Sequence, residues 1–197
     1  MPAYVTEAQV AELLTPADAR LAVEGAFDRL ARGVVQNPAR VRAELPEGVF
    51  AVMPCVDTEL GYAGLKTYAW LPEGTPFIVV LFSIADAAVS AIVEADVLGR
   101  RRTAAASAIA AQHLARDGAT TLGVIGCGRQ AASHVDALRE ALPSLGRVLV
   151  YCRNGRRSTR SAPATTASPR RTIARQRNAT WSSRRRPRAT RCCAGNG

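Results

Sequence analysis

The stretch Thr121-Leu122-Gly123-Val124-Ile125-Gly126-Cys127-Gly128-Arg129-Gln130-Ala131 decides the fold of this chain. Its first five residues form an apolar run that suits a buried strand, and Gly126-x-Gly128-x-x-Ala131 suits a tight turn that leads into a helix. A helix that opens at the end of a strand points its first amides at a pyrophosphate. An ordinary strand-to-helix turn without a ligand is the alternative. In this context we predict a dinucleotide site that includes Gly126, Gly128, Arg129 and Gln130.

The residues after this turn extend the pattern to a β-α-β unit. We expect a strand over 120–125, a helix over 130–142 and a second strand over 147–152. A site for NAD needs an acidic residue at the end of the second strand, to bind the ribose. The chain has Arg153 there, which favours the 2′-phosphate of NADP or is a solvated arginine at a strand end.

The chain before the turn changes its period from helical to strand-like. Thr6 and Gln9 predict a capping box for a short first helix, and Thr15 with Pro16 begins a second helix that Gly33 ends. Alternation then predicts an antiparallel sheet, followed by an alanine-rich helix. Its strands are expected at 40–45, 49–53, 62–69, 77–82 and 89–93, with Met53-Pro54 ending the second strand. The helix is expected to open at 100–103 and to continue over 104–115.

These elements predict an α/β protein with two domains and a tail. A mixed α+β domain would occupy 1–117, including the alanine-rich helix, and an incomplete Rossmann domain would occupy 118–154. The formal charge of +10 comes from residues 155–197, which sum to +12, whereas residues 1–154 sum to −2. Because this tail has few large apolar residues, we expect it to be disordered and to derive from a shifted reading frame. The alternative, an arginine-rich arm for nucleic acid, has little aromatic support.

The five cysteines show neither C-x-x-C pairs nor a histidine at metal spacing. We therefore predict no metal site and free thiols, as in a cytoplasmic protein. The N-terminus lacks the pattern of a signal peptide, and no apolar run is long enough to cross a membrane.

Lys66 is the single lysine of the chain and lies in an apolar strand. A desolvated lysine binds a carboxylate or takes part in imine and proton chemistry, although lysine also protects edge strands. Arg40 and Arg102 are able to form bidentate pairs with a carboxylate, although most arginines are surface residues. Glu94 would either orient Arg102 or cap a turn.

Taken together, these residues resemble the ornithine cyclodeaminase/mu-crystallin family. The resemblance covers residues 3–154 and rests on Arg40, Met53-Pro54, Gly64-Leu65-Lys66, Arg102-Thr103-Ala104-Ala105 and the segment from Gly126 to Ala131 with His134. It implies a homodimer whose first domain, 1–117, binds a small amino acid or cyclic imine and dimerises, and whose Rossmann domain binds NAD or NADP. It also implies that Arg40 and Lys66 hold the substrate carboxylate and that Arg102 lies between substrate and cofactor. Arg102 and Thr103 would contact the cofactor, and Arg129 and Gln130 would line the pyrophosphate.

The family's type reaction converts L-ornithine to L-proline and ammonia through an imine, and relatives are ketimine reductases or alanine dehydrogenases. Ornithine-specific members carry a glutamate where this chain has Ala51. The family's later half, with a catalytic aspartate, is not recognisable after Asn154, so we expect a truncated product that lacks this catalytic residue. A non-catalytic protein that binds NADPH and a small ligand, and a nucleic-acid-binding protein, are the alternatives.

Overall fold

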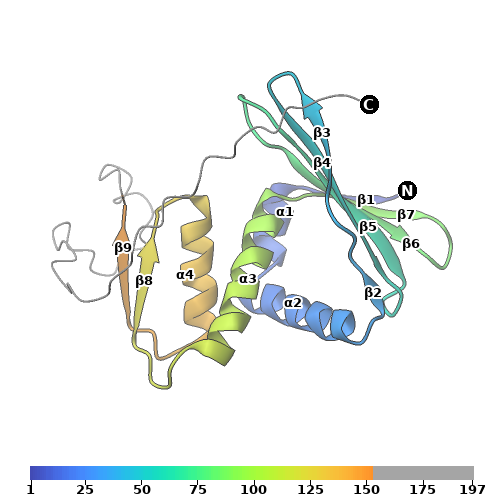
Figure 1. Ribbon diagram of the computed structural model, residues 1–197. Coiled ribbons are helices and arrows are strands. Elements are labelled where there is room, and N and C mark those ends of the chain that lie inside the picture. The colour runs from blue at the N-terminus through green and yellow to red at the C-terminus, as the bar shows by residue number, and fades with distance from the viewer. Residues whose placement is uncertain (153–197) are drawn as a thin grey trace, which may run out of the picture. The chain divides into compact units, whose positions relative to one another are not determined.

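The computed structural model describes residues 1–152, which all belong to one compact unit of the chain (Figure 1). The predictions for Arg153 and for the tail at 155–197 lie outside the described residues. Within residues 1–152 the fold is α/β, as expected, with four helices, a seven-stranded sheet and a two-stranded parallel sheet. The division into domains at residue 118 remains a prediction.

The two N-terminal helices form where their caps predict them. Helix α1 spans Glu7–Leu13 and helix α2 spans Pro16–Ala31. The Thr6 hydroxyl accepts from the amide of Gln9, and the Thr15 hydroxyl accepts from the amide of Asp18, so both capping boxes are present. Gly33 follows α2 with φ +76°, a left-handed conformation that suits glycine after a helix.

The seven-stranded sheet has the order β1-β7-β6-β5-β4-β2, and β3 pairs with β4 next to β2. Its strands are β1 (Ala3–Val5), β2 (Val35–Gln36), β3 (Val41–Leu45), β4 (Gly48–Asp57), β5 (Tyr62–Trp70), β6 (Phe77–Ser83) and β7 (Val89–Glu94). All neighbours are antiparallel except β1, which pairs in parallel with β7. The sequence predicted neither β1 nor β2, because a strand of two or three residues has too little periodicity to recognise.

The prediction that Met53-Pro54 ends a strand was wrong. Strand β4 continues through Pro54 to Asp57 and pairs with β5 along this length. On its other side, β4 pairs with β3 up to Val52 and with β2 from Val56. Pro54 thus lies between the two partners, where the strand behaves locally as an edge, and proline is tolerated at an edge because no ladder hydrogen bond is lost.

Helix α3 spans Asp96–Leu114 and begins earlier than the sequence predicted. Its N-cap, Ala95, has no side chain to cap it; instead the Glu7 carboxylate accepts hydrogen bonds from the amides of Asp96 and Val97. Glu94 in turn accepts from the Glu7 amide at 2.7 Å and from the Tyr4 hydroxyl. Glu94 therefore caps the first turn of α1 and fixes it next to the start of α3. Of its two predicted roles, the orientation of Arg102 was wrong.

The predicted β-α-β unit is present. Strand β8 (Thr121–Ile125) pairs in parallel with β9 (Arg147–Tyr151), and helix α4 (Arg129–Ala141) connects them. Ile125 is 88% exposed, and Leu149, Val150 and Tyr151 are also exposed.

Helix α3 lies between the seven-stranded sheet and α4 (Figure 1). Its contact with α4 is a cluster of small buried residues, Ala104, Ala108, Ala137 and Ala141, with Leu138 at its edge. Side chains of this size let the two helix backbones approach closely. A bidentate pair between Arg20 and Glu140 also joins α2 to α4, with Nε at 2.9 Å. Among the described residues no helix is long and apolar enough to span a membrane.

Candidate functional site

One face of the seven-stranded sheet carries two adjacent rows of side chains that line a pocket. Across the strands, Arg42 pairs with Ala51, Ala51 with Tyr68, and Tyr68 with Phe77. The next row places Met53 beside Lys66. Residues two apart on a strand share a face, so Arg40 lies on the same side as Arg42. The rows are therefore brought together by strand register, from segments that are distant in the sequence.

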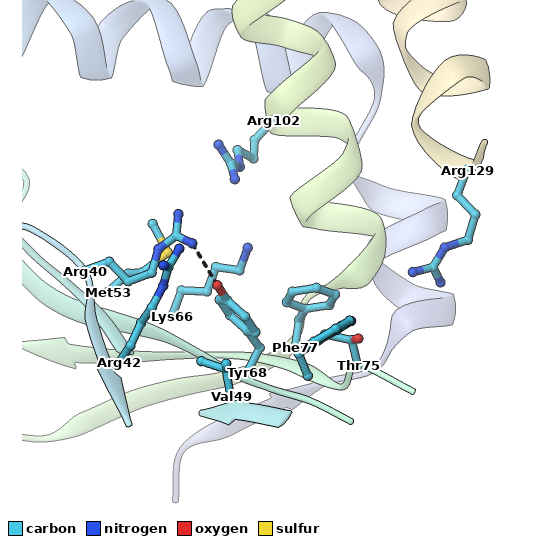
Figure 2. A pocket seen from close by; sticks show the side chains of 11 residues that line it. Arg40, Arg42, Val49, Met53, Lys66, Tyr68, Thr75, Phe77, Arg102 and Arg129 are labelled. Atoms are coloured by element: carbon cyan, nitrogen blue, oxygen red, sulfur yellow. Dashed lines mark hydrogen bonds between the residues drawn. The ribbon is translucent and has the colours of Figure 1, made fainter. Parts of the chain in front are cut away.

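The pocket has a volume of about 430 Å³ and opens between this sheet face, α3 and the first turn of α4 (Figure 2). Its lining combines five cations with aromatic and apolar side chains: Arg40, Arg42, Val49, Met53, Lys66, Tyr68, Trp70, Thr75, Phe77, Arg102 and Arg129. No carboxylate belongs to this lining within the described residues. The arrangement suits an anionic ligand with an apolar part.

Lys66 lies in the centre of β5 with its side chain half-buried. Its Nζ is 4.7 Å from the ring centroid of Phe77 and 5.7 Å from that of Tyr68. On the side of α3, Nζ is 3.8 Å from the position that a Cβ on Gly99 would take. Burial lowers the pKa of Lys66 below its ordinary value, and the neighbouring charges of Arg102 and Arg40 lower it further, while Asp96 opposes them. Since a bound carboxylate would relieve this unfavourable environment, Lys66 is suited to anion binding.

Arg40 and Arg102 approach Lys66 from two other elements. Arg40 directly precedes β3, and its Nη1 donates to the Tyr68 hydroxyl at 2.9 Å. Arg102 points from α3 toward Lys66 without a hydrogen bond or ion pair in residues 1–152 (Figure 2). The structure thus brings the three predicted substrate residues, Arg40, Lys66 and Arg102, to one pocket.

The turn between β8 and α4 has the backbone that the glycine motif predicted. Gly126 has φ +109°, which side chains rarely allow, and its amide donates to the Tyr151 carbonyl at 2.8 Å. Gly128 is the N-cap of α4 and provides no side chain to its first amides. A Cβ on either glycine would meet nothing within 4 Å, so the space in front of the turn is open.

Arg129 connects the two parts of the candidate site. It is the first residue of α4, next to the glycine turn, and its side chain also lines the pocket. Its Nη1 forms an ion pair of 3.1 Å with Asp96 at the start of α3. Gln130 follows in the same helical turn, whereas the Thr103 hydroxyl donates to the Gly99 carbonyl at 2.6 Å within α3 and is not part of the lining.

The prediction of free thiols was wrong for two cysteines. Cys127, between the two glycines, forms a disulfide with Cys152, just after β9, and their Cα atoms are 5.7 Å apart. Parallel strands bring their carboxyl ends to one edge of the sheet, so residues 25 apart become neighbours. Spacing along the sequence does not reveal this pairing. Cys55 is a free thiol.

Sequence reasoning missed several lining residues, chiefly Arg42, Tyr68 and Phe77. The signal for Arg42 was present, since alternation over 40–45 places Arg42 on the same face as Arg40. The two aromatic residues gave no comparable signal, because strands with alternating apolar residues have two faces, and only the packing shows which one faces the pocket.

The sequence model of the ornithine cyclodeaminase/mu-crystallin family matches residues 2–175. The chain therefore belongs to this family. The matched range extends beyond residue 154, where we expected the resemblance to end.

Three proteins show what this chain is similar to within the family. The chain is 34% identical to an alanine dehydrogenase of Archaeoglobus fulgidus over 154 residues, 75% of this chain and 47% of that protein. It is 34% identical to an L-lysine cyclodeaminase of Streptomyces rapamycinicus over 140 residues, 65% of this chain and 40% of that protein. The crystal structure of the iminosuccinate reductase of Paracoccus denitrificans with NAD+ is 29% identical, with a TM-score of 0.75 over 81% of this chain and 52% of that one. The chain thus spans about half the length of these relatives.

Proposed function

We propose that this chain binds a nicotinamide dinucleotide and a small amino or imino acid, and that it serves an NAD(P)-dependent conversion between the two. The observation that carries this proposal is the position of Arg129, which begins the helix after the glycine turn and also lines the pocket that holds Lys66, Arg40 and Arg102. One arginine thus joins an anion-binding pocket to a turn suited to phosphates.

The residues of the turn fit a dinucleotide. The open space in front of Gly126 and Gly128 permits close approach of phosphates, and the uncapped first turn of α4 offers backbone donors. We propose that Gly126, Gly128, Arg129 and Gln130 hold the pyrophosphate and that Thr103 lies near the cofactor. A nicotinamide ring supplies a hydride acceptor or donor when bound.

The pocket residues have separate tasks in this proposal. Arg40, Lys66 and Arg102 bind the substrate carboxylate, and Phe77 and Tyr68 shield this region from water. The low pKa of Lys66, caused first by burial, makes its ammonium a better proton donor than an ordinary lysine. Charge binding at one end of the substrate would orient its α-carbon and nitrogen for reaction.

The relatives leave the reaction type open. They include an amino acid dehydrogenase, an imine reductase and a cyclodeaminase, and Ala51 replaces the glutamate that we associate with ornithine specificity. We therefore place oxidation or reduction at the C–N bond of an amino or imino acid first, with cyclodeamination as the alternative.

A second candidate is a binding protein without catalysis. It is favoured by the pocket lining, which among the described residues combines cations and apolar side chains suited to binding with no carboxylate. Under both candidate functions we also propose that the chain forms a homodimer, as the family resemblance implies. Light scattering after size-exclusion chromatography would test this.

Calorimetry on the 197-residue chain with NADH and NADPH tests the proposal. We expect one of them to bind, and G128D to weaken it at least about tenfold, because its carboxylate would repel the phosphates. The control G146D places the same charge in the exposed turn before β9 and should bind like the wild type. If neither cofactor binds, the proposal is wrong. If one binds but L-alanine, L-proline and L-ornithine are not converted, the non-catalytic candidate is favoured.

A further inference from the structure

The pocket contains more positive charge than the carboxylate of one substrate would balance. Its lining has five cations, Arg40, Arg42, Lys66, Arg102 and Arg129, and no acid among the described residues. Arg129 is paired with Asp96 outside the lining. The other four have no ion pair in residues 1–152, so a ligand with one carboxylate would leave much of this charge unbalanced.

Four arginines outside the lining, Arg20, Arg29, Arg32 and Arg100, are matched with acids in the described part of the chain. Arg20 binds Glu140, Arg29 binds Asp57 at 2.7 Å, and Arg32 binds both Asp28 and Glu59. Unmatched cations held close together repel one another, which is unfavourable unless a ligand offsets the repulsion. Their concentration at one cavity therefore points to an anion with more than one charged group.

Arg42 is the cation whose position is not explained by a single carboxylate. The group formed by Lys66, Arg40 and Arg102 occupies the row of Met53 and the side of α3, and the Arg40 guanidinium is bonded to Tyr68. Arg42 lies one row further along the same face, about 7 Å along the strand, given the rise of a β-strand. It has no hydrogen bond or ion pair within the described residues.

A small residue separates Arg42 from Tyr68 in this row. Ala51 is the neighbour of Arg42 on β4 and is 1% exposed, with Tyr68 on its other side. Ala51 is covered by its neighbours and is not part of the pocket lining. It also offers no charge of its own to bind the Arg42 guanidinium.

We propose that Arg42 is a specificity-determining residue that binds a second acidic group of the substrate. The substrate class is then a dicarboxylic amino or imino acid of four or five carbons, with its α-carboxylate at Lys66 and Arg102 and its side-chain carboxylate at Arg42. This inference rests on the proposed function for the placement of the α-carboxylate. An arginine in this place disfavours a diamine, because the distal ammonium would face a like charge.

Matched pairs of amino acids test this assignment by calorimetry on the full 197-residue chain at low salt and without cofactor. L-Aspartate and L-asparagine have nearly the same shape, and differ in the charge that Arg42 would bind; L-glutamate and L-glutamine repeat the comparison with one more carbon. We expect the acid of at least one pair to bind about tenfold tighter than its amide, as for one charge-assisted contact. Equal binding of acid and amide in both pairs, or binding of none of the four, would overturn the proposal.

The variant R42Q assigns the preference to a residue. It should bring acid and amide to within about twofold while the affinity for the amide stays the same, and R42K should keep a preference for the acid. The control R116Q removes an exposed arginine after α3 and should leave the preference unchanged. A preference for the acid that survives in R42Q would overturn the role of Arg42. If R42Q does not fold, the other measurements still test the role of Arg42. Loss of the preference for the acid in R42K, or its absence in the wild type, would overturn that role.

The proposed function fails in a different way. Loss of NADH and NADPH binding with the aspartate preference intact would contradict the proposed function and leave the second acidic subsite supported. Binding of NADH or NADPH with no preference between acid and amide would support the proposed function and contradict the second acidic subsite.

Discussion

Arg101 and Arg102 follow one another in α3, yet one is bound within the protein and the other is not. Arg101 Nη1 donates to the carbonyls of Val10 at 3.2 Å, Ala11 at 2.9 Å and Leu14, where α1 ends. Arg102 points into the pocket near Lys66 and has no such partner in residues 1–152. Successive helix residues point about 100° apart, so identical neighbours reach different surroundings. Arginines that satisfy backbone groups stabilise the fold, and arginines left unmatched at a cavity are available to a ligand.

The largest effect on stability is expected from R101M. Methionine keeps an unbranched apolar chain but leaves the carbonyls at the end of α1 without this donor. We expect a loss of about 1.5 to 3 kcal/mol, the usual value of a hydrogen bond to a charged group, and hence a Tm lower by about 3 to 12 °C. Differential scanning calorimetry measures it, with R116M as the control for loss of an exposed arginine. A Tm equal to that of R116M would show that Arg101 does not stabilise the fold.

Replacement of the next residue, Arg102, by methionine should lower the affinity for the ligand and leave the stability of the fold unchanged. R102M removes one of the cations that we assign to the substrate carboxylate, so the affinity for L-aspartate should fall about tenfold. Its Tm should stay within about 1 °C of the wild type, because no contact within residues 1–152 is lost. Isothermal calorimetry and a melting curve on one preparation make the test. Unchanged affinity would contradict the role of Arg102.

A smaller effect is expected in the pH dependence of stability at Lys66. Burial first, and then Arg102 and Arg40, hold the pKa of Lys66 below 10.5 in the folded protein. Between the folded and unfolded values the unfolded chain binds more protons, so stability due to Lys66 rises with pH and is lost as pH falls. The wild type should therefore gain stability relative to K66M as the pH is raised from 7.5 toward 10.5. Melting curves of both proteins over this range would show it, and parallel curves would argue against a perturbed lysine.

The smallest expected effect is on the Lys66 titration itself. Lys66 is the single lysine of the chain, so labelling with 13Cε-lysine yields one NMR signal. We expect its midpoint to lie below 10.5 in the wild type and to rise in R102M, because a nearby positive charge is removed. In R101M the midpoint should not move, since that charge faces α1. An equal shift in both variants would mean that the two arginines are not as different as their contacts indicate.

Local patterns in the sequence predicted much of the fold. The helix caps at Thr6 and Thr15 and the β-α-β unit around Gly126 formed close to the predicted bounds, because caps, glycine turns and periodicity depend on residues a few positions apart. The start of α3 was missed, because its cap is the distant Glu7. Strand β4 was predicted too short, because the partners on either side of Pro54 are set by the sheet.

The amino-acid sequence by itself determined the class of protein and the residue types of the site. Lys66, Arg40, Arg102 and the glycines of the turn carry a family pattern that is readable without coordinates, since each is a local choice of side chain or backbone freedom. Only the tertiary structure decided which arginines are free for a ligand, how Arg42 joins the pocket and that Cys127 meets Cys152. These depend on strand register and on the packing of α3 and α4, which bring distant residues within the short range of charge and hydrogen-bond interactions.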